Sequence, residues 1–255
     1  MSKLLIVPPL PVAALAASRG SGVANLLTPD PKEVWANASN SAGTGVLTVD
    51  LGAARQVDTI FLGFLGSAGA GALWGLVGGV NQPGEFTIQI DSQMRVEDVP
   101  GRSSEPSHAL WFGPPVNTRF LQIYLNQPLD AQLSAGVLVV GKAFIADLGQ
   151  EWGFGRRPID TGTATALASG GFSVVQGAKK IGATWTFGDL STAEVDQLEA
   201  IALDLGQTTP ALVVENADHT PGLRARIRYG LFKWRAFERR NRAQTRWEME
   251  IEDWV

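Results

Sequence analysis

The side chains that most often carry out catalysis or bind metals are scarce in this sequence. It contains no cysteine and only two histidines, His108 and His219. Thiolate zinc sites, iron–sulfur clusters, disulfides and cysteine nucleophiles are therefore excluded, as are histidine-rich metal centres. The sequence also lacks a Gly-x-Ser-x-Gly elbow, a P-loop, a His-Glu-x-x-His helix and a calcium-loop pattern. We expect no catalytic residues, no metal and no cofactor, and therefore a protein that is not an enzyme.

Acidic side chains could still form a catalytic pair on folding, because the acids of glycosidases have no local sequence signature. Each candidate here lies in a predicted strand or turn, where a structural role is the more common one. These candidates are Asp50, Asp58, Asp91 and Asp160.

An apolar, glycine-rich stretch supplies the first candidates for contact with a ligand or partner. Residues 59–84 carry no charge, but their many glycines make a membrane helix unfavourable. We expect a buried strand followed by a long loop, 66–84, whose tip carries Trp74 beside Leu73 and Leu76. An exposed aromatic tip is typical of contact surfaces, and burial of Trp74 fits the sequence equally well.

Two further ligand candidates in the first half are Trp35 and His108. Trp35 could stack on a sugar ring, but a tryptophan near the start of a strand more often belongs to the core. His108 could hydrogen-bond to a glycan, but a lone histidine beside Pro106 is more typical of a turn.

The second half supplies candidates for a subunit interface. Nine basic residues fall near the end of the chain, and Arg224, Arg226 and Arg228 alternate along a predicted strand. They could form a solvated strand face, contact acidic patches on neighbouring subunits, or face DNA in a tube lumen. Trp152 and Phe154 are further interface candidates. The net charge of −4 is not concentrated in either half, so we expect no specific nucleic acid partner.

The elements that must position these side chains are predicted to be mainly short β-strands. Of the 255 residues, 45% are hydrophobic and 18% are charged, which allows a sizeable core. The 29 glycines and 14 prolines punctuate the apolar runs and indicate tight turns. The predicted strands are 46–51, 59–65, 86–91, 109–112, 119–125, 137–145, 172–176, 181–187, 211–215, 223–229, 232–237 and 244–252.

One helix is predicted, over residues 191–205. Ser191 and Glu194 form a capping box, apolar residues recur on one face, and Gly206 ends the helix. In the strand 244–252, apolar residues alternate with charged ones, so we expect one face of this strand to be buried and the other to be charged.

Glycines and a proline interrupt the pattern between residues 147 and 160, and we place a domain boundary there. We expect an extended N-terminal arm, 1–24, that packs on a neighbour. An antiparallel sandwich or jelly roll, 25–148, and a small β domain, 149–255, with one covering helix follow it. The apolar run that opens the arm also resembles a secretory signal, but its three prolines would break the helix that a signal peptide forms.

Several segments of the predicted jelly roll occur in an order that resembles a discoidin domain. They are the aromatic segment 35–39, the strand 47–52 that ends in Asp-Leu-Gly, and the segments 55–60, 86–92, 118–124 and 138–141. Discoidin domains, or coagulation-factor type C domains, are galactose-binding-like jelly rolls that bind glycans, lipid headgroups or proteins through loops at one end. This sequence lacks the family's frequent cysteine pair and carries an apolar insert around Trp74, so no ligand residues are carried over.

The second domain resembles the tail-tip, or distal-tail-like, proteins of tailed bacteriophages. The resembling segments are 160–162, 169–171, 185–187, 210–214, 229–230 and 246–251. Those proteins place a β domain with one helix in a ring at the end of the tail tube.

Together the two resemblances imply a structural virion protein of a phage tail tip or baseplate, assembled in the host cytoplasm. The second domain would form a homo-oligomeric ring beside tail-tube and hub proteins. The first would display a carbohydrate-binding-like domain that contacts host surface glycans. The alternative is a free carbohydrate-binding module or adhesin with a spacer domain, and a peripheral membrane binder that inserts Trp74 is a third alternative. We expect no membrane span.

Overall fold

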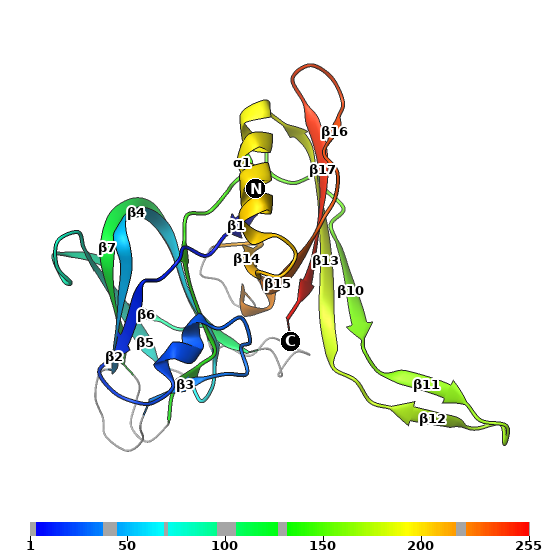
Figure 1. Ribbon diagram of the computed structural model, residues 1–255, viewed down its shortest axis with the longest axis horizontal. Coiled ribbons are helices and arrows are strands. Elements are labelled where there is room, and N and C mark those ends of the chain that lie inside the picture. Colours follow the sequence, from blue (N-terminus) through cyan, green and yellow to red (C-terminus); the bar gives the residue numbers. More distant parts are fainter. Residues whose placement is uncertain are drawn as a thin grey trace. The chain divides into compact units, whose positions relative to one another are not determined.

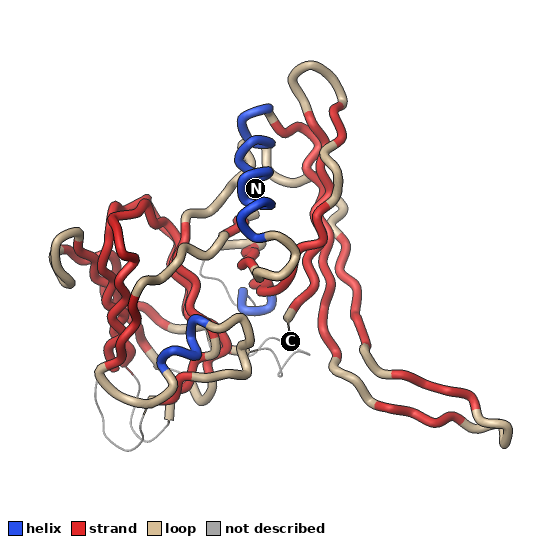
Figure 2. Tube along the Cα trace, viewed as in Figure 1, coloured by secondary structure: helices blue, strands red, loops and turns tan. Residues whose placement is uncertain are grey.

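The computed structural model of the 255-residue chain describes residues 4–37, 45–68, 71–95, 106–126, 132–217 and 223–254, without the side chains of 223 and 224. It is mainly β, as predicted, and its described part has one α-helix (Figures 1 and 2). The chain forms two compact units. Unit 1 comprises Met1–Phe144 and Leu212–Ile227, and unit 2 comprises Ile145–Ala211 and Arg228–Val255. The first segment of unit 1 ends at Phe144, close to the boundary predicted between residues 147 and 160. The second segment, Leu212–Ile227, was not indicated by any sequence pattern.

Unit 1 is built on a curled antiparallel sheet of six strands. Their order is β2-β4-β7-β5-β6, and β9 also pairs with β4. The long strands β4 and β7 each join two segments that the sequence predicted as separate strands, and register shifts bend the pair (Figure 1). The bounds are β2 (Ala14–Ala17), β4 (Gly45–Leu65), β5 (Leu73–Gly79), β6 (Phe86–Gln93), β7 (Ser107–Asn126) and β9 (Val137–Gly141).

The alternation of apolar residues along the sheet decides which face forms the core of unit 1. Leu47, Val49 and Leu51 are buried, while Thr48 and Asp50 between them are half-buried on the other face, as predicted. The core cluster also includes buried residues from β5, β7 and β9, and Ile88 of β6 is partly buried against it.

The N-terminal segment is part of unit 1 and not an extended arm that packs on a neighbour. β1 (Leu5–Val7) is buried and pairs antiparallel with residues 212–214 of β14 (Ala211–Val214). β2 pairs with β4. The short apolar runs on either side of the prolines therefore complete sheets of their own chain, which satisfies their backbone groups. Smaller elements of this unit are η1 (Val23–Leu27), η2 (Leu223–Arg226) and the pair β3 (Trp35–Ala36) and β8 (Ser134–Ala135).

The glycine-rich segment 66–84 contains a strand inside the sheet, so the predicted long loop is wrong. β5 lies between β7 and β6. Its glycines permit close packing in the sheet: a Cβ on Gly78 would lie 2.6 Å from the ring of Phe86, and one on Gly75 would lie 3.2 Å from Asp91 Oδ1. Glycine at these positions reflects the close approach of neighbouring side chains within a strand, which the sequence pattern alone does not distinguish from a loop.

Unit 2 has a sheet with strand order β15-β17-β13-β10, and β16 also pairs with β17. A separate two-stranded ribbon, β11 and β12, extends the β10–β13 hairpin beyond this sheet (Figure 1). The bounds are β10 (Gly155–Asp160), β11 (Thr163–Ala166), β12 (Phe172–Val175), β13 (Lys179–Leu190), β15 (Ile227–Trp234), β16 (Glu238–Arg239) and β17 (Thr245–Asp253). The predicted strand 223–229 was wrong in its first half, which forms η2.

The helix and the last strand follow the sequence prediction. α1 (Thr192–Leu205) begins with a capping box in which the Ser191 Oγ accepts from the Glu194 N–H and Glu194 accepts from the Ser191 N–H at 2.7 Å. In β17 the apolar residues are buried, and Trp247 stacks on Phe187 with ring centroids 5.7 Å apart. The alternation in β17 thus separates the core of unit 2 from a charged outer face.

Candidate interaction site

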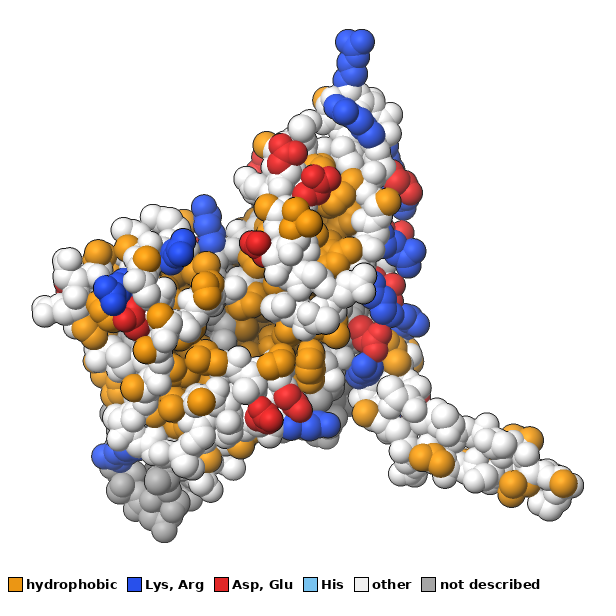
Figure 3. Space-filling model, viewed as in Figure 1, with side chains coloured by type: hydrophobic (Ala, Val, Ile, Leu, Met, Phe, Trp, Pro, Cys, Tyr) orange, Lys and Arg blue, Asp and Glu red, His pale blue; other side chains and the backbone are white. Residues whose placement is uncertain are grey.

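The ribbon that extends from the sheet of unit 2 is the most unusual surface of the described chain. We call residues 161–178 the arm. They contain no charged residue. All eight residues of β11 and β12 are exposed. In Figure 3 the arm shows hydrophobic side chains and no charged ones.

The register of the arm sorts its side chains into two faces. Ala166 pairs with Phe172, and Ala164 pairs with Val174, so these four apolar residues share one face. Phe172 is 70% exposed and Val174 is 64% exposed. Two isolated strands are marginally stable in water, and an exposed apolar face is typical of an interaction surface. The arm therefore has the chemistry of a docking element.

Backbone hydrogen bonds fix the hairpin both at the base of the arm, where it leaves the sheet, and at its tip. At the base, the Thr161 N–H donates to the Ala178 carbonyl at 3.0 Å. At the tip, the Leu167 N–H donates to the Gly171 carbonyl at 2.8 Å, and Gly170 adopts a φ of +85° that favours glycine. These contacts define a hairpin without help from side-chain packing.

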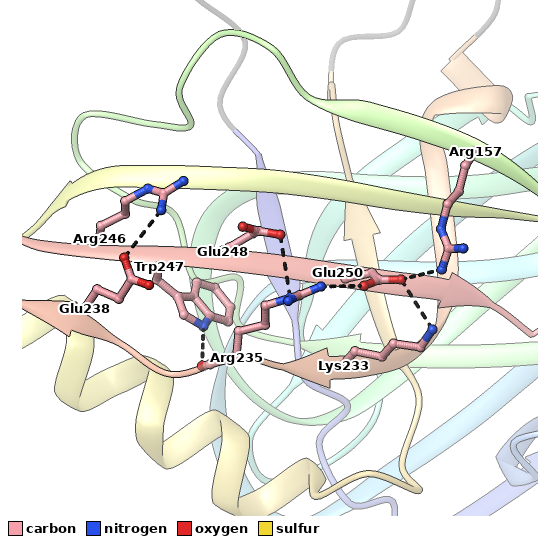
Figure 4. A network of polar contacts seen from close by, with 8 residues as sticks. All are labelled: Arg157, Lys233, Arg235, Glu238, Arg246, Trp247, Glu248 and Glu250. Carbon is pink, nitrogen blue, oxygen red and sulfur yellow. Dashed lines mark hydrogen bonds and ion pairs between the residues drawn. The ribbon is translucent and has the colours of Figure 1, made fainter.

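The outer face of the unit 2 sheet carries a network of ion pairs centred on Glu250 (Figure 4). Glu250 Oε1 lies 2.7 Å from Arg157 Nη2 and 3.3 Å from Lys233 Nζ, and Oε2 lies 3.4 Å from Arg235 Nη2. The Trp247 indole N–H, which comes from the core face, donates to the Arg235 carbonyl at 3.2 Å. Glu250 on β17 thus contacts basic residues from β15 and the residue after it on one side, and from β10, which lies beyond β13, on the other.

The acidic groups of this face are held in their charged form. The hydrogen bond from Arg157 lowers the pKa of Glu250 below its ordinary value, and Lys233 adds to the effect. Lys180 and then Lys233 lower the pKa of Glu252 in the same way. Hydrogen bonds to Glu252 and Glu250 raise the pKa of Lys233. The charges on this face therefore neutralise one another within the chain.

The aromatic and histidine candidates of the first half are buried. Trp74 is 1% exposed, so the exposed-tip interpretation is wrong, and Leu76 is also buried, while Leu73 is half-buried. Trp35 has no exposed surface, and its indole N–H donates to the Arg19 carbonyl at 3.2 Å. His108 Nδ1 accepts from the Phe64 N–H at 3.2 Å. None of these five side chains forms an open binding surface in unit 1.

The three arginine candidates are not brought together on a strand face. Arg228 is buried and its Nη1 lies 2.9 Å from Asp253 Oδ2. Arg226 is exposed and lies in η2, and the side chain of Arg224 is outside the described residues. The predicted alternation is wrong because the strand begins only at Ile227.

Trp152 and Phe154 remain candidates for a contact surface. Trp152 is 92% exposed, and Phe154 is about half exposed. The guanidinium carbon of Arg156 lies 5.5 Å from the centroid of the Phe154 ring. These side chains lie just before and at the start of β10, the strand that leads into the arm.

Among the described residues there is no group of three or more acidic or histidine side chains that could hold a metal ion. Within the same residues, no helix has the length and apolar character needed to cross a membrane. Three of the four aspartates considered as catalytic candidates, Asp50, Asp58 and Asp160, accept hydrogen bonds from their own chain. For example, Asp58 accepts from the Ala143 N–H at 2.7 Å, and Asp50 forms a two-pronged pair with Arg119.

Sequence reasoning missed the arm, although a signal for it was present. The prediction recognised only the strand 172–176 and placed no partner opposite it. The absence of charge over residues 161–178, with small and β-branched residues on both sides of Gly170 and Gly171, would have indicated a hairpin. That none of it packs against the sheet became evident only from the structure.

No model of a known protein family and no curated protein sequence matches this chain. Solved structures match about half of it. They include chitosan-binding module 1 from a chitosanase/glucanase of Paenibacillus sp. IK-5, at 11% identity and a TM-score of 0.42, over 53% of this chain and 99% of that chain. The family 32 carbohydrate-binding module of C. perfringens NanJ in complex with galactose matches at 16% identity and a TM-score of 0.42, over 55% and 99%.

Another match is reduced XRCC1 bound to the catalytic domain of DNA polymerase beta, at 19% identity and a TM-score of 0.41, over 53% of this chain and 99% of that chain. The matched proteins thus have different partners. Similarity at this level assigns neither a ligand nor an activity to this chain.

Proposed function

We propose that this chain is a non-enzymatic assembly protein that associates with other copies of itself through the arm of unit 2. The observation that carries the proposal is the apolar face formed by Ala164, Ala166, Phe172 and Val174, which the chain itself leaves exposed. Covering such a face stabilises the marginal two-stranded ribbon and removes apolar surface from water. A second copy is a suitable partner because the arm has no charge to direct it to a strongly charged surface.

The setting that best fits the proposal is the one implied by the resemblance of the second domain, a ring at the tip of a phage tail. In that setting unit 1 is displayed by the ring, and tail-tube and hub proteins are its neighbours in the virion. Trp152 and Phe154 are exposed apolar side chains just before β10, at the end of this strand that is away from the arm, and they offer a second contact surface for the same role.

The experiment is sedimentation velocity of the full chain and of a variant in which residues 162–177 are replaced by an Asn-Gly turn. We expect the full chain to associate and the shortened chain to be monomeric, with rings visible by negative-stain electron microscopy only for the former. Leu203→Ser, which removes an exposed apolar side chain from α1, is the matched control and should associate normally. A monomeric full chain, or equal association without the arm, would show that the proposal is wrong.

A second candidate function is glycan binding by unit 1, and one observation favours it. Tyr124 lies on the outer face of β7, and the residue opposite it on β5 is Gly75, so no side chain from that position flanks the ring. The Tyr124 hydroxyl donates to Gln122 Oε1 at 3.0 Å. A partly exposed ring beside an ordered amide suits stacking and hydrogen bonding to a sugar.

A glycan array with the full chain tests the second function, with Tyr124→Ala as the binding-site variant. Val46→Ala is a control, because Val46 pairs with Tyr124 across the opposite strand and lacks a ring. Binding that survives Tyr124→Ala would place any glycan site elsewhere. Absence of binding to all glycans would leave assembly as the proposed function.

A further inference from the structure

Unit 2 contains a groove beside β15 and the C-terminal end of β17, and its lining includes residues from both faces of the sheet, such as Lys233 and Trp234. It has a volume of about 480 Å³, and residues from both strands and from β13 line it. Its apolar lining consists of Leu231, Phe232, Trp234 and Trp254. The indole N–H of Trp234 donates to the Gly206 carbonyl at 2.9 Å, so this ring is held in place by the end of α1. The groove is therefore a partly preformed apolar site.

The charged residues that line the groove are paired within unit 2. Glu252 forms ion pairs with Lys180 and Lys233, and Asp253 pairs with Arg228. A groove with these internal pairs offers little net charge to attract an ionic ligand. An uncharged, apolar occupant suits it better, because such an occupant does not have to break any of these pairs.

We propose that this groove receives the arm of a second copy of this chain, with Phe172 as the side chain that enters it. The inference rests on the proposed function and names the partner surface. The match is one of chemistry: the arm has no charge over 161–178 and presents one apolar face, and the groove combines four apolar side chains with neutralised charges. A large aromatic side chain entering a pocket lined by tryptophans is typical of an interface centre.

The pairing is of the head-to-tail type, because the arm and the groove are different surfaces of the same unit. Each copy gives one arm and receives another. Such contacts close into a ring when the rotation between copies allows it and form open filaments when it does not. The arm-to-groove contact therefore allows closed rings of two or more copies, whereas an arm-to-arm contact would stop at two copies.

The absence of cysteine allows a direct test by cross-linking. One full-length protein carries Ala166→Cys, which lies opposite Phe172 on the apolar face of the arm and leaves the phenylalanine in place. A second protein, enlarged by a tag, carries Leu231→Cys. The two are mixed and treated with a short bis-maleimide, and the mixed product is identified by its mass on a denaturing gel. The control mixture replaces the second protein by tagged Leu203→Cys, on the exposed face of α1.

We expect at least tenfold more mixed product with Leu231→Cys than with Leu203→Cys. Because Leu231 is half-buried, Gln207→Cys provides a second groove position that is exposed and does not depend on repacking. Both groove variants should give the product, and both should lose it when the groove-bearing protein also carries Trp254→Asp.

The outcomes separate this inference from the proposed function. If association depends on the arm but neither groove position cross-links above the control, the groove inference is wrong and the proposed function stands. If the chain without its arm associates like the full chain, or the full chain is monomeric, both are wrong. Cross-linking of Ala166→Cys only to itself shows an arm-to-arm contact and overturns the groove inference.

Discussion

Replacing Glu250 by glutamine should destabilise the sheet of unit 2 more than any other single charge change on its outer face. The carboxylate is only 8% exposed and has three cationic partners, at 2.7, 3.3 and 3.4 Å. A hydrogen bond to a charged group contributes about 1.5–3 kcal/mol. The partners Arg157, Lys233 and Arg235 are about half exposed, so water and salt replace part of the lost interaction. We expect a net loss of about 1.5–2.5 kcal/mol.

Hydrogen exchange measured by mass spectrometry on peptides from β17 is the appropriate assay, because it reports on unit 2 without assuming that the two units unfold together. The expected loss corresponds to roughly 10- to 60-fold faster exchange, since about 1.4 kcal/mol is a factor of ten. Glu248→Gln is the matched control. Glu248 is a third exposed and lies 3.6 Å from Arg235, so it should change exchange by less than about twofold. Equal effects of the two variants would refute the reasoning.

The same interaction predicts a pH dependence with a definite sign. The pKa of Glu250 in the folded protein lies below its ordinary value of 4.5, because Arg157 and then Lys233 stabilise the charged form. Its contribution to stability is therefore complete above the ordinary value and is lost as the pH falls through 4.5 toward the folded pKa. The difference in exchange between the native chain and Glu250→Gln should be constant from about pH 6 to 8 and shrink below about pH 5. A difference that grows on acidification would contradict this assignment.

Three further predictions concern the arm, the core and the helix. Phe172→Ser should weaken self-association. A phenylalanine buries at least about 150 Å², and 70% of this one is exposed, so covering it contributes about 2.5 kcal/mol. Its loss should raise the dissociation constant, measured by sedimentation velocity, roughly 60-fold. Trp74→Ala should lower the unfolding free energy of unit 1 by about 3–5 kcal/mol in denaturant titrations, because the Trp74 ring is 1% exposed. A loss under about 1 kcal/mol would mean that this ring is not in the core. Ser191→Ala should lower the unfolding free energy by about 1 kcal/mol in denaturant titrations, because the N-cap of α1 is lost. Ser191→Asp should be nearly neutral. Equal losses for both variants would show that the cap is not formed by the side-chain oxygen.

Two uncharged, glycine-containing segments, the arm and the strand β5, have opposite environments in the structure, and the sequence pattern did not distinguish them. Residues 66–84 are apolar and rich in glycine, and the sequence favoured an exposed loop, but close neighbours on β6 make β5 a strand within the sheet. Residues 161–178 are also uncharged and glycine-containing, yet the structure leaves them outside any sheet with several strands. Composition could not separate the two cases, because burial depends on whether neighbouring strands are present on both sides.

The sequence by itself determined the mainly-β class, the capped helix α1, the two-faced strand β17 and the absence of thiol chemistry. These features follow from local rules: a side-chain period of two, a capping pair three residues apart, and the residue types present. Only the tertiary structure decided that Trp74 is buried, that the N-terminal residues complete a sheet with β14, and that Glu250 meets Arg157, which is 93 residues away in the chain. Such contacts depend on strand order and register, which local residue patterns do not specify.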